Sequence, residues 1–336
     1  MIAAIYNEAL LHGECYDNLH VLCKQVGNRI AGSENAAKAI EWGVLTCMKY
    51  DFDSVFQMPV EVPHWVRGPK EIGFYNSYDQ RIDFNIVALG GSVGSKEMIT
   101  AEVIEIKSLA ALDTIPEDQI KGKIVFFNKA MDPLLINTGA AYGGAYDIRS
   151  QGPSKAASKG AVACIIRSLT LADDQYAHTG ATQYDDSLPK IPAAALSSVD
   201  ARALSYALKD NPHLKFSIHL QCEVFPRIMQ ANVVAEIRGS EFPDQYIIVG
   251  GHLDSWDIGE GAHDDGTGVT QAIEVLRIMR ALGYQPKHTI RAVLYMNEEF
   301  GNDGGKTYAE VVKANGEKHI AAVESDGGGL TPQGFF

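Results

Sequence analysis

The chain has 336 residues, enough to bury a large core and to form two domains rather than one. Its 42 acidic residues against 29 basic ones give a formal net charge of −13. That charge argues against a nucleic acid or an anionic membrane as partner, because either would need a basic surface. No apolar run approaches the roughly 18 residues of a membrane span, so we expect no membrane-spanning segment.

The N-terminal part of the chain predicts helices followed by strands. Apolar residues recur at helical spacing over residues 1–49, with an interruption at residues 27–32. Ser33 follows this interruption and is a typical N-cap for the next helix. Apolar and polar residues then alternate over residues 52–62, as in a strand, and a second strand is predicted over residues 71–75.

Residues 83–225 have a different pattern. Short runs typical of strands, such as residues 86–89 and 123–127, alternate with turns rich in glycine and proline. One helical stretch, residues 154–160, precedes a buried strand over residues 161–166. We interpret this block as a β-rich domain inserted into a host domain. An irregular extension of the host sheet is the alternative.

The last third of the chain predicts strands that alternate with helices. This alternation is typical of a mostly parallel sheet with right-handed crossovers. We therefore expect an α/β fold with a mostly parallel open sheet and flanking helices, to which residues 1–82 contribute the first part and residues 226–336 the main part. The predicted strands cover residues 232–237, 246–250, 289–296 and 320–323, and the predicted helices cover residues 265–282, stopped by Gly283, and 306–314, ended by Gly316.

Histidine and acidic residues gather at the ends of these predicted strands, which is where an open α/β sheet collects its functional groups. Several carboxylates at one sheet edge would repel one another unless a cation lay between them, and nitrogen and oxygen donors without thiolate suit zinc or a similar divalent ion. The five cysteines show no Cys-x-x-Cys spacing, so we expect buried free thiols, with one disulfide as the alternative. The clusters contain His252 and Asp254, Asp264 and Asp265, Glu298 and Glu299, and Asp326.

Each cluster alone also has a purely structural interpretation. His252 could be a buried structural histidine, and Asp264 and Asp265 could simply favour a helix N-terminus. Neighbouring side chains on a strand point in opposite directions, so one of Glu298 and Glu299 can bind metal while the other takes a proton from a metal-bound water. Taken together, the clusters predict a metallohydrolase with two metal ions.

These motifs resemble those of the co-catalytic zinc exopeptidases of metallopeptidase family twenty-eight. The resemblance implies the fold of the zinc aminopeptidases, with a protease-associated domain as the insertion, and it covers nearly the whole chain. It is carried by residues 252–257, 264–268, 298–299 and 324–327 in the last third, by residues 149–152, 163–168, 178–180 and 189–193 in the inserted block, and by residues 62–65.

The resemblance also implies a role for each site residue in a centre of two zinc ions. One zinc polarises the scissile carbonyl while the zinc pair activates a water molecule, and the peptide bond between the two neighbouring aspartates is cis. By this resemblance His252 and Asp326 bind one zinc, Asp264 bridges both, Glu299 binds the second, Glu298 is the general base and Asp254 orients His252.

The implied substrates are dipeptides or short peptides with free termini, cleaved by an aminopeptidase, carboxypeptidase or dipeptidase activity. The resemblance implies an extracellular or periplasmic protein, although no signal peptide is visible, and a cytoplasmic one is the alternative. We expect the inserted domain to narrow access to the metals, or alternatively to serve as scaffold or as the contact of a homodimer.

One part of the family pattern has no counterpart in the sequence. The family has a fifth metal ligand, a histidine well after the motif of Asp326, whereas His319 comes too early and lies in a predicted strand. The sequence therefore predicts that the catalytic domain is truncated at its C-terminus. A non-catalytic receptor-like protein and a cyclase with a single zinc, both on the same fold, are the alternative functions.

Overall fold

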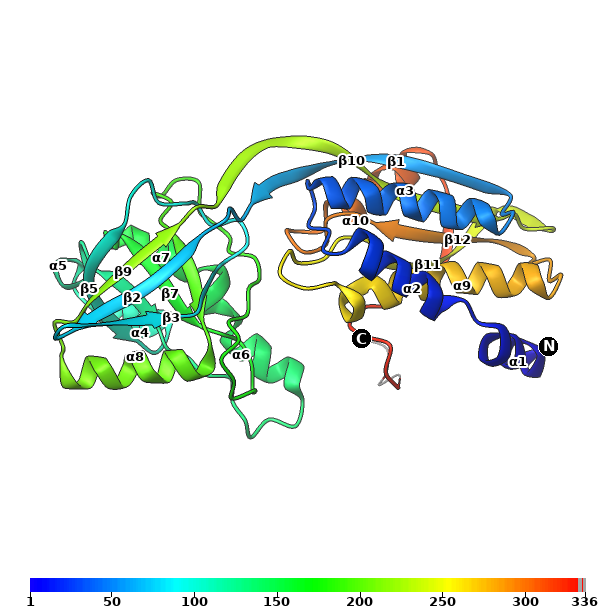
Figure 1. Cartoon of the computed structure of the whole chain (residues 1–336). Helices are drawn as coiled ribbons and strands as arrows, with labels where there is room; N and C mark the ends of the chain where they lie inside the picture. Colours follow the sequence, from blue (N-terminus) through cyan, green and yellow to red (C-terminus); the bar gives the residue numbers. More distant parts are fainter. Residues whose placement is uncertain (332–333, 335–336) are drawn as a thin grey trace. The chain divides into compact units, whose positions relative to one another are not determined.

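The computed structural model describes residues 1–331 and residue 334, and the chain forms two compact units (Figure 1). The host unit contains Met1–His64 and the described residues from Phe225 onward, and the inserted unit contains Trp65–Val224. The sequence had placed the first boundary after residue 82. The insertion begins earlier because strand β2 (Glu71–Ser77) pairs along its length with β3 (Gln80–Phe84) and β9 (Lys215–Leu220), which belong to the inserted unit.

The host unit contains a five-stranded mixed sheet, whereas the sequence predicted a mostly parallel one. Strand β11 is parallel to both of its neighbours, but β10 and β12 are antiparallel. The short link over residues 238–241 reverses the chain after β10, and β12 then lies between β10 and β11. The order across the sheet is β1 (Ser54–Val66), β10 (Glu223–Ile237), β12 (His288–Tyr295), β11 (Phe242–His252) and β13 (Lys318–Glu324).

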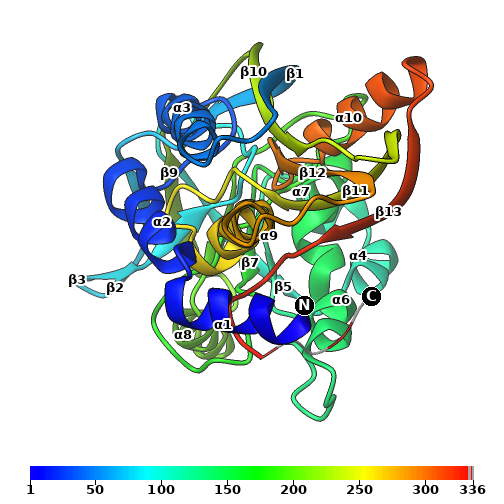
Figure 2. The ribbon, with the colours of Figure 1, turned by 90° about the vertical axis from the view of Figure 1, so that its right-hand side faces the viewer.

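Two helical crossovers place β11 at a reversal of strand order. Helix α9 (Thr267–Ala281) leads from β11 to β12, and α10 (Asp303–Ala314) leads from β12 back past β11 to β13. Right-handed crossovers that run in opposite directions put their helices on opposite faces of the sheet, and Figure 2 shows α9 and α10 on its two sides. The crevice beside such a reversal is where open α/β sheets bind ligands.

The strand residues of the host unit alternate between two cores, as the period of two in a strand requires. Val233, Ala235 and Leu294 are buried in the core under α9 and α3 (Glu34–Lys49). Val234 and Val293 point the other way and pack against Tyr308 and Val312 of α10.

The N-terminal helices agree with the helical spacing of the sequence. They are α1 (Ile2–His12), α2 (Cys15–Val21), the π-helical turn η1 (Leu22–Val26) and α3. The expected cap is confirmed, because Ser33 Oγ accepts a hydrogen bond of 3.0 Å from the backbone N–H of Ala36. The expected stops are confirmed too, since Gly283 and Gly316 adopt positive φ angles of 61° and 67°.

The inserted unit has a sheet of its own, which disfavours an irregular extension of the host sheet, and it contains helices as well as strands. Its sheet runs parallel from β5 to β8 and antiparallel at both ends. The order is β3, β2, β9, β5 (Ile99–Ile106), β6 (Ile124–Phe127), β7 (Ala163–Arg167), β8 (Ala193–Leu196) and β4 (Ile86–Ala88), and the helices are α4 (Leu109–Thr114), α5 (Glu117–Ile120), α6 (Thr138–Ser150), α7 (Gly152–Ser158) and α8 (Ser198–Asp210).

The structure also bears on the expected free thiols and on the expected absence of a membrane-spanning segment. All five cysteines are free thiols, four of them buried and Cys15 half-buried, as the sequence predicted. Among the helices of the described residues, none combines the length and the apolar character that a membrane crossing needs.

Candidate metal centre

The end of β11 brings a histidine to the carboxyl edge of the host sheet. His252 is the last residue of β11, and the strand lies against the start of α9 at this point. A Cβ atom on Gly251 would lie only 2.5 Å from the backbone nitrogen of Val269, so glycine is needed for this close approach. The backbone at the end of β11 therefore packs directly against the start of helix α9.

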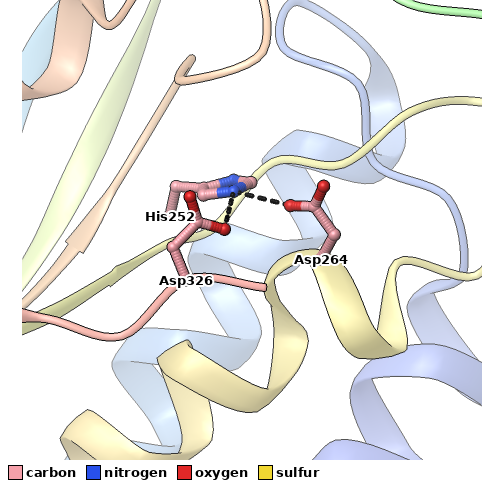
Figure 3. Close-up of side chains that lie close together, drawn as sticks. All are labelled: His252, Asp264 and Asp326. Atoms are coloured by element: carbon pink, nitrogen blue, oxygen red, sulfur yellow. Dashed lines mark ion pairs between the residues drawn. The ribbon is translucent and has the colours of Figure 1, made fainter. Parts of the chain in front are cut away.

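His252, Asp264 and Asp326 converge at this edge (Figure 3). His252 Nε2 lies 2.9 Å from Oδ1 of Asp264 and 3.7 Å from Oδ1 of Asp326. One ligand atom from each residue lies within 4.8 Å of the others. The histidine is only 1% exposed, whereas the two aspartate side chains are 56% and 58% exposed. A buried nitrogen therefore faces two carboxylates that solvent can reach, which is an arrangement that can hold a cation.

Asp254 lies behind the histidine and is fully buried. Its backbone oxygen is 3.1 Å from His252 Nδ1, whereas its carboxylate is 3.7 Å from the same atom. A proton on Nδ1 that is held by this carbonyl leaves Nε2 free to bind a metal. The carboxylate of Asp254 instead accepts the backbone N–H groups of Glu298 at 3.0 Å and Glu299 at 3.3 Å. Asp254 therefore contacts the histidine through its backbone and both glutamates through its side chain.

Asp265 is buried and caps the start of α9. Its carboxylate accepts the backbone N–H of His252 at 2.9 Å and that of Gly268 at 3.0 Å. The sequence predicted that the helix begins at Asp265, but it begins at Thr267. Asp265 has a non-helical backbone and acts as a cap instead. The peptide bond between Asp264 and Asp265 is cis, as the resemblance implied.

Glu298 and Glu299 follow β12 in a turn that Asn297 makes possible. Asn297 is fully buried and has a positive φ of 69°, a conformation that asparagine tolerates better than most residues. Sequence reasoning gave Asn297 no role, although an asparagine at a strand end is a recognisable turn signal. The turn directs the backbone N–H groups of both glutamates toward Asp254.

Glu299 is not among the three residues that converge, but its charge interacts with theirs. Its Oε1 is buried and finds no hydrogen-bond partner among the described residues. Burial, and then the charge of Asp264, raise the pKa of Glu299 to about 9. A buried carboxylate oxygen without a partner costs free energy unless a proton or a cation neutralises it. The donor set of imidazole and carboxylates, together with this unpaired oxygen, therefore fits one or more divalent cations.

Without metal, the free energy of unfolding is expected to fall as the pH rises from about 5 to about 9. Burial raises the pKa of Asp265 to about 8 and that of Glu299 to about 9, well above the ordinary range of these carboxyls. Both carboxyls therefore bind their proton more tightly in the folded chain, and the stability they contribute is lost as the pH rises through that window. Burial lowers the pKa of His252, but the nearby carboxylates of Asp254, Asp264 and Asp326 raise this pKa by more, which acts in the same direction.

Urea denaturation at pH 5, 7 and 9 in the presence of a chelator measures this dependence. The variant Glu299→Gln removes one of the titrating groups and is expected to show a shallower slope. A free energy of unfolding that stays constant or rises over the window would contradict the expectation.

Comparisons with known proteins show which proteins the chain is similar to. The model of peptidase family M28 matches residues 232–336. The chain is similar to carboxypeptidase Q of Xenopus laevis, with 38% identity over 97% of this chain and 68% of that protein. It is also similar to the crystal structure of a peptidase M28 precursor from Shewanella amazonensis SB2B, with a TM-score of 0.91 and 36% identity over 97% of this chain and 74% of that one.

A third likeness concerns the fold alone. A zinc aminopeptidase from Bacillus subtilis has a TM-score of 0.64 at 20% identity, and the match covers 88% of this chain and 64% of that one. The high identity and coverage of the carboxypeptidase Q match, together with the motifs at the edge of the host sheet, lead to one conclusion. The chain belongs to peptidase family M28.

Proposed function

We propose that the chain is a zinc-dependent exopeptidase whose active site holds two zinc ions. The observation that carries this proposal is the convergence of His252 Nε2 with the carboxylates of Asp264 and Asp326. His252 and Asp326 would hold one zinc, Glu299 the other, and Asp264 would contact both. The unpaired Oε1 of Glu299 supports a second cation beside the first. The zinc aminopeptidase of similar fold supports the choice of zinc.

Bound zinc would supply Lewis acidity toward a peptide carbonyl and toward a water molecule. The residues of the chain would then position and move the protons. Glu298 is half-buried, and burial raises the pKa of its carboxyl, which suits a group that must both accept and release a proton. In the proposed reaction Glu298 takes the proton of the attacking water and delivers it to the leaving amine nitrogen. Asp254 holds the backbone of Glu298 in place for this transfer.

The proposed substrates are dipeptides or short peptides with free termini, and we propose the inserted unit as a protease-associated domain that narrows access to the site. The names of similar proteins include both carboxypeptidase Q and aminopeptidases, so the proposal leaves the end of the peptide that is recognised open. An extracellular or periplasmic location and a homodimer remain predictions from the resemblance.

The test combines zinc stoichiometry with hydrolysis. The whole chain is stripped of metal with a chelator, titrated with zinc chloride and assayed on unblocked, N-acetylated and C-amidated dipeptides. We expect two zinc ions per chain and hydrolysis that requires at least one free terminus. A stoichiometry of one without peptide hydrolysis would favour the single-zinc cyclase, and a chain that binds no zinc would favour the receptor-like protein; either result would overturn the proposal.

A further inference from the structure

Arg29 is a fully buried arginine close to the metal centre. It lies in the loop between η1 and α3, and its exposed fraction is 0%. Within the described residues, its guanidinium donates hydrogen bonds only to backbone carbonyl oxygens and none to a carboxylate. The bonds run from Nε to Leu253 at 2.6 Å, from Nη1 to Glu260 at 3.0 Å and to Gly27 at 3.4 Å, and from Nη2 to Gly261 at 2.7 Å.

Three of these carbonyls belong to one loop, which we call the site loop. It comprises residues 253–261 and joins His252 at the end of β11 to the turn that carries Asp264. Leu253 directly follows His252, and Gly261 precedes Asp264 by three residues, so one guanidinium binds both ends of the loop. Arg29 therefore connects the two segments that carry the proposed zinc ligands His252 and Asp264.

The neighbours of Arg29 hold the middle of the same loop. The side-chain amide of Asn28 donates to the backbone oxygen of Asp257 at 2.8 Å, and the backbone N–H of Arg29 donates to Ser255 Oγ at 3.3 Å. Lys24 and Glu260 form an additional ion pair, but both side chains are more than half exposed, so this pair contributes little. Residues 28 and 29 thus contact the start, the middle and the end of the site loop.

The charge of Arg29 is costly to bury at this location, and burial lowers the pKa of its guanidinium. Burying a guanidinium without a paired carboxylate is costly, and a neutral side chain could also donate to carbonyls. The space around the loop has little room for other groups, because a Cβ on Gly261 would lie 2.6 Å from Nη1 of Arg29. The carboxylates of Asp254, Asp265 and Asp264 offset part of this burial cost. Arg29 therefore offsets part of the negative charge that the centre gathers.

We infer that Arg29 is a positioning residue for the metal centre: its guanidinium fixes the site loop so that His252 and Asp264 meet in the geometry that a metal requires. The inference rests on the proposed function, since it assigns the loop to zinc binding. Arg29 does not contact substrate or metal in this arrangement. Partners that orient metal ligands typically change metal affinity by about 10–100-fold when they are replaced.

The experiment compares Arg29→Lys with a matched control, Arg291→Lys, in the whole chain. Arg291 is a second buried arginine of the host unit, but it pairs with Glu236 and Glu317 in contact with Tyr308 of α10, on the other face of the sheet. Zinc affinity is measured by competition with a chromophoric chelator, and the visible spectrum of the cobalt(II)-loaded chain reports the coordination geometry. We expect Arg29→Lys to lower zinc affinity by about 10-fold or more and to change the cobalt spectrum. Arg291→Lys should lower stability but leave both readouts unchanged.

The outcomes separate this inference from the proposed function. If the unaltered chain binds no zinc, the proposed function fails. If it binds zinc and Arg29→Lys binds zinc equally well with the same cobalt spectrum, only the inference fails. Should Arg29→Lys not fold, Asn28→Ala and Ser255→Ala decide, because each removes one bond between the same segment and the site loop. Lower zinc affinity at unchanged stability then supports the inference, and unchanged affinity overturns it.

Discussion

Replacing Glu298 with glutamine is expected to lower kcat for dipeptide hydrolysis by about 10²–10⁴-fold while zinc remains bound. Glutamine keeps the size of the side chain but cannot take the proton of the attacking water. The hydrogen bond from the backbone of residue 298 to Asp254 does not depend on the side chain, so the turn should keep its shape. Steady-state kinetics and zinc content, measured on the same preparation, test both parts of the expectation.

Glu324→Gln is the matched control for this variant. Glu324 ends β13 and is more exposed than Glu298, but partial desolvation raises the pKa of its carboxyl, as it does for Glu298. We expect this variant to keep most of its turnover, because Glu324 has no part in the proposed proton transfer. If both variants lost activity equally, the effect would stem from a lost negative charge near His252 rather than from a lost base. A Glu298→Gln variant with near-normal turnover would refute the assignment outright.

The host strands and helices could be predicted because their signals are local. The apolar run before His252 and the helical spacing of apolar residues in α9 are both visible in consecutive residues. The burial of the strand follows from its apolar run. Parallel strands then gather their carboxyl ends at one edge, so the approach of His252 to Asp326 follows from the topology of β11 and β13. Such features need no knowledge of distant contacts.

Features that depend on distant pairing could not be predicted in the same way. The direction of β10 is set by β12, which enters the sheet more than 50 residues later. The early start of the inserted unit depends on β2 pairing with β9, far along the chain. Helix α6 contains Gly139, Gly143 and Gly144 and carries a weak apolar period, so its local sequence does not clearly favour a helix over a loop.

Side chains that act through the backbone were also invisible in the sequence. Arg29 stands in a stretch that reads as a loop, and only the fold shows that its guanidinium reaches carbonyls more than 220 residues away. Asp254 was expected to orient His252, and it does contact His252 Nδ1 through its backbone oxygen, whereas its carboxylate binds the backbone of the two glutamates. A sequence motif identifies the residue types of a centre but not which atom of each residue makes the contacts.

Replacing Asp264 and Asp265 with asparagine, one at a time, is expected to show that one residue matters for zinc affinity and the other for stability. Asp264→Asn should lower zinc affinity by more than about 100-fold, because a proposed ligand matters more than the outer partners whose loss costs 10–100-fold. The Asp264 side chain is 56% exposed, so the stability of the metal-free chain should barely change. Zinc competition and urea denaturation of the metal-free chain measure the two effects.

Asp265→Asn should do the opposite, because both carboxylate oxygens of Asp265 accept backbone N–H groups, from His252 and Gly268. The asparagine amide turns an NH₂ group toward one of these donors, which should lower the free energy of unfolding by about 1–3 kcal/mol. Equal losses of zinc affinity in both variants would show that the pair acts as a unit rather than as a ligand and a cap.

Added zinc makes the contrast between the two variants sharper. Because zinc binds the folded chain, a free concentration 100 times the dissociation constant stabilises that chain by about 2.7 kcal/mol. Asp264→Asn should lose this gain at the same concentration, whereas Asp265→Asn should retain most of it on top of a lower baseline. The two aspartates share a cis peptide bond and differ in little but burial. If the two variants differ in this way, the different roles of Asp264 and Asp265 come from the environment of each side chain.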